Sequence, residues 1–202
     1  MAAHPKQERT LVIMKPDAVQ RSLIGEILSR YERTGLKLIA MKMLVPTPDM
    51  VEKHYLLDPA WKKNVGEKSI AAYVKKGETP PSDDPIKVGN IVVAALMKYL
   101  SAGPVVAMVW QGSHAVELVR KVTGGTEPRT SDVGTIRGDY VIDSYHMADV
   151  DGRAIRNLIH ASGSVGEAEA EIAHWFKSEE IQSYRHLNEA ILYDVNLDGI
   201  LE

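Results

Sequence analysis

Four short apolar runs stand out along the chain and predict four β-strands. They fall at residues 10–14, 36–44, 104–110 and 157–160. Polar residues, glycines or prolines bound these runs, as they commonly do at the ends of strands. A chain with this pattern is expected to build one sheet whose strands are connected through helices.

Helical spacing of apolar residues fills most of the segments between the four runs. Helices are predicted at 22–34, 48–55, 91–100, 113–122 and 165–176. The resulting order is β-α-β-α-α-β-α-β-α, with short connections. It favours an α+β fold of the ferredoxin-like type, βαββαβ, in which a four-stranded antiparallel sheet carries helices on one face. A doubly wound sheet fits this order less well.

Residues 58–90 break the pattern, because lysines, glycines and the turn-forming run 80–85 are gathered there. We expect an excursion from the core with one short helix near residues 68–74. A second irregular stretch covers residues 139–154. The lysines would form a nucleic-acid patch or a solvated face. The second is favoured, because acidic residues are interleaved with them and aromatic residues are sparse.

Composition limits the class of protein. The chain has 202 residues, 45% of them hydrophobic, which suits a single domain with insertions. It has no cysteine, which excludes disulfides, zinc–thiolate sites and thiol nucleophiles. A net charge of −3 disfavours nucleic-acid or membrane-surface partners. No signal core or membrane-spanning run is present, so we expect a cytoplasmic location.

His160 is the leading candidate for chemistry. It ends the fourth predicted strand, and Ser162 and Ser164 then offer N-caps for the next helix. A histidine at a strand-to-helix junction can face an anion held by backbone N–H groups, and it is largely neutral and nucleophilic near pH 7. Glu171 in that helix would hold the second ring nitrogen. The alternative is an ordinary structural histidine beside an apolar run.

The ends of the predicted strands and helices bring further polar residues towards one edge of the sheet. These are Lys15, Arg120, Thr126, Arg137 and Asn157. Converging cations beside an imidazole fit a polyphosphate better than a neutral ligand. The alternative is that each cation is a surface residue. The sequence contains neither a Walker A loop nor a dinucleotide-binding glycine fingerprint, so those phosphate cradles are excluded.

Several blocks resemble the nucleoside diphosphate kinase family, in the family's order. They are residues 8–19, 101–110, 126–128, 134–139 and 157–164, with Glu171 and Trp175–Phe176 downstream. The resemblance spans residues 8 to about 184 apart from two insertions, at about 58–90 and 143–155. It implies one nucleoside diphosphate kinase domain over 1–202.

The resemblance implies a magnesium-dependent, ping-pong transfer of the γ-phosphoryl of a nucleoside triphosphate, typically ATP, to a nucleoside diphosphate. His160 would carry the group as phosphohistidine, oriented by Glu171 with support from Ser162. The implied nucleotide-binding residues are Lys15 and Tyr55 at the transferred group, Arg120, Thr126 and Arg137 at the other phosphates, and Asn157 with Lys15 at the ribose. The family also implies a homo-oligomer, a tetramer or a hexamer.

Two departures from the family pattern stand out. Gly163 occupies a position that is usually Asp, so a carboxylate near the phosphates and magnesium is absent. This leaves open a nucleotide-binding regulatory protein without efficient transfer, although the intact candidate residues disfavour it. The other departure is the excursion at 58–90, which falls where the family supplies its base-stacking aromatic and leaves Val92 at the collinear position. We expect Trp61 or Tyr73 to stack on the base, with Ala154 as its small apolar neighbour. The two insertions would form a lid or extend a subunit interface.

Overall fold

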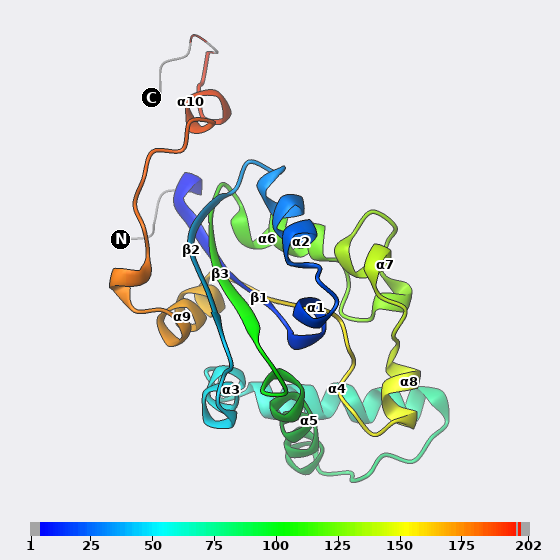
Figure 1. The fold of residues 1–202 in the computed structure, drawn as a ribbon. Coiled ribbons are helices and arrows are strands. Elements are labelled where there is room, and N and C mark those ends of the chain that lie inside the picture. Colours follow the sequence, from blue (N-terminus) through cyan, green and yellow to red (C-terminus); the bar gives the residue numbers. More distant parts are fainter. Residues whose placement is uncertain (1–4, 197, 199–202) are drawn as a thin grey trace.

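A computed structural model describes residues 5–196 and 198 (Figure 1). Its sheet contains β1 (Glu8–Met14), β2 (Lys37–Leu44), β3 (Val105–Gly112) and β4 (Ile159–Ala161). The strands lie in the order β2-β3-β1-β4, and each paired neighbour is antiparallel. This is the split βαβ order of a ferredoxin-like sheet, so the predicted α+β fold is confirmed.

Helices and short turns connect the strands. The helices are α1 (Pro16–Gln20), α2 (Ile24–Glu32), α3 (Pro48–Tyr55), α4 (Trp61–Lys76), α5 (Pro85–Leu100), α6 (Ala115–Thr123), α7 (Ile136–Tyr140), α8 (Tyr145–Val150), α9 (Val165–Trp175) and α10 (Glu189–Leu192), with 3-10 turns η1 (Pro5–Gln7), η2 (Pro128–Thr130) and η3 (Ser178–Glu180). Among the described residues, no helix is both long and apolar enough to cross a membrane.

Helices cover both faces of the sheet, so the expectation of a single covered face is wrong. Val12 and Met14 of β1 pack into a core with residues of α2 and α6. Leu11 and Ile13, which point the other way, pack with residues of α3 and α9. The reason is visible in β1 and β3, whose apolar runs lack polar alternation. Such runs are typical of strands that are buried on both faces.

The two segments predicted to be irregular are more helical than expected. The short helix expected near 68–74 belongs to α4, which has 16 residues. The helix expected from residue 91 begins earlier, because Pro85 occupies its first turn and the Asp84 carboxylate accepts the Ile86 N–H at 2.9 Å. In the second segment Ser144 caps α8 by accepting the Met147 N–H at 3.2 Å. Neither cap was predicted from the sequence.

Two glycines let α4 and α5 approach closely. A Cβ atom on Gly66 would lie 1.9 Å from the carbonyl oxygen of Pro85. A Cβ atom on Gly89 would lie 2.2 Å from the carbonyl oxygen of Lys62. Both neighbours are backbone atoms, which cannot swing away as a flexible side chain can. The hairpin of α4 and α5, which projects below the sheet in Figure 1, therefore depends on both glycines.

We expect Gly66→Ala to destabilise the protein by about 1–3 kcal/mol, because the added methyl group overpacks the contact between α4 and α5. Gly25→Ala is the matched control, since Gly25 is also helical and a Cβ there meets nothing within 4 Å. The control should stabilise by about 0.5–1 kcal/mol. Urea unfolding measures both changes. Shifts of the same sign in the two variants would contradict the proposed close contact.

Candidate active site

A strained turn places His160 on β4. Leu158 has a left-handed φ of +63°, and the Ile159 N–H donates to the Asn157 carbonyl at 2.7 Å, which makes a γ-turn. The end of β1 holds this turn from the other side. The Lys15 N–H donates to the Leu158 carbonyl at 2.7 Å, and the Asp17 carboxylate accepts the Leu158 N–H at 3.2 Å. Strain of this kind persists only where the surroundings fix it.

Glu171 reaches His160 from α9, as the sequence predicted. Its Oε1 lies 2.8 Å from His160 Nε2. The Ser162 hydroxyl donates to Glu171 Oε2 at 2.6 Å and accepts the Leu11 N–H at 3.2 Å, which ties the carboxylate to the central strand. Burial opposes ionisation of Glu171, but the two histidines beside it (His160 and His54) and Ser162 together lower its pKa to about 2.

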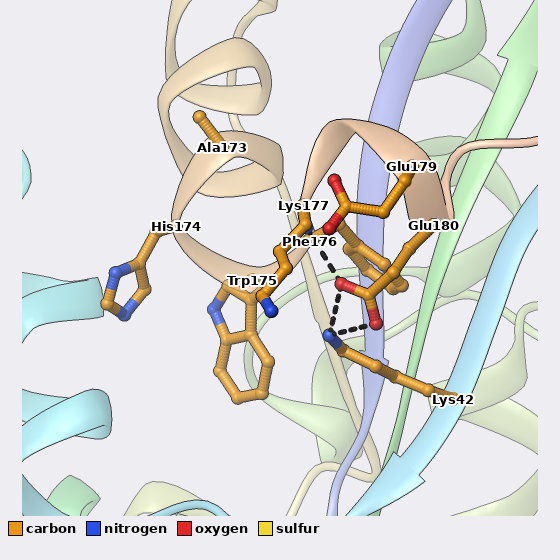
Figure 2. Close-up of a pocket in the computed structure, with 8 residues that line it drawn as sticks. All are labelled: Lys42, Ala173, His174, Trp175, Phe176, Lys177, Glu179 and Glu180. Carbon is orange, nitrogen blue, oxygen red and sulfur yellow. Dashed lines mark hydrogen bonds and ion pairs between the residues drawn. The ribbon is translucent and has the colours of Figure 1, made fainter.

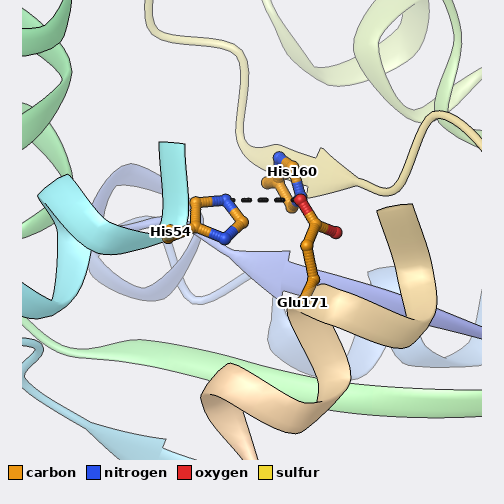
Figure 3. Close-up of side chains that lie close together, drawn as sticks. All are labelled: His54, His160 and Glu171. Carbon is orange, nitrogen blue, oxygen red and sulfur yellow. Dashed lines mark ion pairs between the residues drawn. The ribbon is translucent and has the colours of Figure 1, made fainter. Parts of the chain in front are cut away.

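An ionised carboxylate beside Nε2 selects one tautomer of His160. The N–H group is placed on Nε2, so Nδ1 keeps its lone pair. In Figure 3 the ring nitrogen that does not face Glu171 points away from the carboxylate. Nδ1 is therefore the nitrogen free to react.

His54 is part of this cluster, and the sequence analysis gave it no role. Its ring lies edge-on to that of His160, with 4.5 Å between the centroids. His54 Nδ1 accepts the indole N–H of Trp175 at 3.1 Å, so its own N–H lies on Nε2, 3.7 Å from Glu171 Oε1. Burial, followed by the charge of His160, lowers the pKa of His54 to about 3. Only the fold reveals this residue, because α3 is far from β4 in sequence.

The ligand atoms of His54, His160 and Glu171 lie within 4.8 Å of one another, a spacing that a metal ion could use (Figure 3). The indole N–H of Trp175 leaves the proton of His54 on Nε2, and the carboxylate favours the proton of His160 on its own Nε2. A metal ion would have to displace both protons.

Lys15 lies at the end of β1 and is almost fully buried. Its ammonium donates to the Asn157 side-chain oxygen at 2.7 Å and lies 5.1 Å from the centre of the Tyr99 ring. The Asn157 amide in turn donates to the carbonyl of Thr126 at 2.9 Å. Burial, aided by the charge of Arg137, lowers the pKa of Lys15 to about 7, against the opposing effect of Asp17.

The two candidate arginines differ in their surroundings. Arg137 is buried, and its guanidinium donates to backbone carbonyls of Gly124, Gly125, Asn157 and Ile159. It thereby clamps the loop after α6 to β4, and burial lowers its pKa. Arg120, in the last turn of α6, is exposed at the same cleft. Arg120 is free to meet a ligand, whereas Arg137 is largely occupied in holding the backbone.

One cleft of about 1530 Å³ joins the predicted site residues. Those that line it are Lys15, Tyr55, Val92, Arg120, Thr126, Arg137, Asn157, His160 and Glu171. Ser162 is fully buried behind Glu171. Trp61, Tyr73 and Ala154 also line the cleft.

The two expected insertions form facing walls of this cleft. Residues of α4 and α5 line one side, and residues of α8 and the following turn line the other. The Lys76 ammonium at the end of α4 lies 2.6 Å from the Asp149 carboxylate on α8. The Trp61 ring of α4 lies 5.0 Å from the ring of Tyr55 on α3.

A smaller pocket of about 410 Å³ lies at the C-terminal end of α9 (Figure 2). There the Lys42 ammonium lies 2.8 Å and 2.9 Å from the two oxygens of Glu180. Glu180 also accepts the Lys177 N–H at 2.7 Å. These charges pair with one another and join η3 to β2, so the larger cleft is the candidate active site.

The cleft has the chemistry of a phosphoryl-transferring enzyme with a histidine nucleophile. It combines a free imidazole nitrogen, backed by a buried carboxylate, with lysine and arginine side chains suited to phosphate oxygens.

Comparison with known proteins identifies the family. The sequence profile of the family described as nucleoside diphosphate kinase matches residues 8–69 and 87–181. A nucleoside diphosphate kinase of Pyrobaculum aerophilum is 48% identical over 178 residues, covering 86% of this chain and 97% of that protein. One from Pyrococcus furiosus is 43% identical over 177 residues, 88% of each chain. The chain belongs to the nucleoside diphosphate kinase family.

Solved structures agree with this assignment. The crystal structure of the Pyrobaculum aerophilum NDP kinase gives a TM-score of 0.85 at 46% identity, covering 88% of this chain and 100% of the other. A transition-state mimic of the Borrelia burgdorferi enzyme, with bound vanadate and ADP, gives 0.76 at 36% identity, with coverages of 93% and 98%. The activity of this chain is thus phosphoryl transfer between nucleoside triphosphates and diphosphates.

The lowered pKa of Lys15 predicts proton uptake when a nucleotide binds. Near a pKa of about 7 the lysine is mostly neutral at pH 8. Phosphate oxygens favour its charged form, so binding of a non-hydrolysable ATP analogue at pH 8 should take up as much as about one proton. At pH 6 the lysine is already charged, and its contribution should vanish.

Calorimetry of binding of the ATP analogue in buffers with different ionisation enthalpies measures this uptake. Lys15→Met is the control, and the difference between it and the wild-type protein isolates the lysine. An equal uptake in both proteins at pH 8 would rule out Lys15 as its source.

Proposed function

We propose that His160 Nδ1 carries the phosphoryl group between the two half-reactions of a ping-pong cycle. The observation that carries this proposal is the 2.8 Å contact between His160 Nε2 and Glu171, which leaves Nδ1 as the nucleophile. The Nδ1 lone pair forms a bond to the γ-phosphorus as the bond to the bridging oxygen breaks. The nucleoside diphosphate leaves, and a second one takes the group from the phosphohistidine by the reverse steps.

The other cleft residues bind and orient the nucleotide in this proposal. Lys15 and Tyr55 contact the transferred phosphoryl group, and Lys15 with Asn157 contacts the ribose. Arg120 and Thr126 hold the remaining phosphates. Arg137 fixes the backbone around the phosphates, as its hydrogen bonds to carbonyl groups indicate. A direct contact between Arg137 and a phosphate would add to that role. The vanadate and ADP bound by the Borrelia burgdorferi relative support this use of the cleft.

Magnesium fits the same proposal. In nucleotide sites Mg²⁺ usually takes one or two protein carboxylates, several waters and the substrate's phosphates as ligands. The cleft wall formed by α9 offers a carboxylate in Glu167, which would reach such an ion through one of its waters. When bound, the ion neutralises charge on the phosphates and orients them. The protein's own part is to align the phosphates with His160 Nδ1 and to hold the other ring nitrogen, Nε2, beside Glu171.

Glu171→Gln should lower kcat by about a hundred- to ten-thousand-fold, because an amide no longer enforces the reactive tautomer of His160. Ser162→Ala keeps the carboxylate but removes one of its hydrogen bonds. It should lower kcat by about tenfold. Steady-state kinetics with ATP and a second nucleoside diphosphate measures both. The role assigned to Glu171 would be wrong if Glu171→Gln lost no more activity than Ser162→Ala.

We further propose one domain over residues 1–202, in which the insertions at about 58–90 and 143–155 enclose the base. The family profile leaves residues 70–86 unmatched, which fall within the first of these segments. The ion pair of Lys76 and Asp149 links the two walls and supports a lid that closes over the bound nucleotide.

Trp61→Ala should raise the nucleotide KM by about tenfold, because stacking of an aromatic ring on a base contributes about 1–3 kcal/mol. Trp61→Phe keeps a stacking face and should stay near the wild-type value. Tyr73→Ala tests the alternative stacking residue. An unchanged KM in Trp61→Ala would remove Trp61 as the base-stacking residue.

A homo-oligomer, a tetramer or a hexamer, is proposed on the basis of β2. This edge strand leaves Met41 and Met43 more than half exposed, and Val45 just after it is 62% exposed. Such an apolar strip is typical of a surface that another subunit covers.

Nucleotide substrates and a cysteine-free chain also suit the proposed cytoplasmic location.

A further inference from the structure

Position 163 is Gly rather than Asp, and the carboxylate of Glu167 lies beside it. Glu167 Oε2 accepts the backbone N–H of Gly163 at 2.9 Å. A Cβ atom built on Gly163 would lie 2.5 Å from that same oxygen and 3.9 Å from Arg120 Nη1. The carboxylate of Glu167 therefore occupies the space in which a side chain at position 163 would begin.

The start of α9 determines this placement. Ser164 caps the helix by accepting the Glu167 N–H at 3.2 Å, which fixes Glu167 in the first turn. From there its side chain folds back over the end of the helix. The residue is exposed and lines the cleft together with His160 and Arg120. Its carboxylate is thus open to the ligand that the cleft receives.

A capping role alone would be the simpler explanation. A Glu three residues after a capping serine commonly accepts the backbone N–H of that serine. Here it accepts the N–H of Gly163 instead, one residue earlier. Oε1 makes no hydrogen bond to the described residues, so one oxygen stays available while the other is anchored. Acceptance of one N–H does not require a negative charge, whereas a magnesium ion does favour one.

We propose that Glu167 positions the magnesium ion of the nucleotide complex and so replaces the carboxylate that Gly163 lacks. The inference rests on the proposed function, since it assumes that phosphates occupy the cleft beside His160. Glu167 would accept hydrogen bonds from waters on the ion, because Mg²⁺ gives up its waters reluctantly. Because Gly163 has no side chain, it leaves space for the carboxylate of Glu167, which comes from α9.

This arrangement couples positions 163 and 167. Gly163→Asp in the wild-type background brings two carboxylates into one space, where they repel each other and crowd Glu167. The same substitution in a protein that already carries Glu167→Gln would return a single carboxylate to the site. The effect of Gly163→Asp should therefore change sign with the residue at position 167, which independent sites would not show.

The test compares wild type with Glu167→Gln, Gly163→Asp and the double variant G163D/E167Q. Binding of Mn²⁺ to each protein–ADP complex is followed by electron paramagnetic resonance, with thermal unfolding as the check on folding. The amide oxygen introduced by E167Q can still accept the Gly163 N–H, so a purely capping residue would leave Mn²⁺ binding unchanged. We expect E167Q and G163D each to weaken it by about tenfold or more, and the double variant to recover most of the loss.

Unchanged Mn²⁺ binding in E167Q would overturn the inference. The inference would also be overturned if the double variant bound Mn²⁺ as weakly as the single variants. ADP binding without metal is measured beside each titration, so loss of the nucleotide site itself is recognised. The proposed phosphohistidine fails separately, if wild type binds Mn²⁺ and ADP but never becomes phosphorylated. The two failures are therefore distinguishable.

Discussion

The contact between His160 and Glu171 is the interaction on which the rest of this structure depends. An ionised carboxylate that is 3% exposed is stable only if its lost hydration is replaced. Ser162 supplies a hydroxyl proton, and the imidazoles of His160 and His54 lie 2.8 Å and 3.7 Å from the carboxylate. In return the carboxylate fixes the tautomer of His160 and leaves Nδ1 to the cleft. The negative charge of Glu171 acts strongly because it is buried. It thereby orients His160 so that Nδ1 is the nucleophile.

The fold holds His160 and Glu171 in the positions that make this contact. β1 lies between β3 and β4, and its far end holds the γ-turn at Leu158 through Lys15 and the Asp17 side chain. Arg137 adds a second restraint from the loop after α6. A left-handed leucine is costly, and these bonds compensate for that cost. The result is a short β4 that presents His160 from a rigid backbone, while α3 and α9 supply its neighbours.

The sequence predicts this centre well, because its signals are local. His160 follows an apolar run, and Glu171 follows a capping serine by a helical interval. Other features depend on packing between distant segments. His54 reaches the site only because α3 crosses the same face as α9, and nothing near it in sequence indicates this. The length of α4 was underestimated because Gly66, read as a helix breaker, is where α5 packs. Glu167 was overlooked for a similar reason: only the backbone geometry shows that it fills the space above Gly163.

The sequence departures and the family assignment fit one proposal, in which the phosphate end of the cleft is retained and its surroundings are rebuilt. Lys15, Arg120 and His160 line this cleft together with residues of α4, α5 and α8. The most direct measurement is incubation of wild type and His160→Ala with magnesium and γ-labelled ATP, followed by a chase with GDP. Our account predicts acid-labile label on wild type alone, which then passes to GTP. Equal labelling of His160→Ala, or no label on a wild-type protein that binds nucleotide, would contradict it.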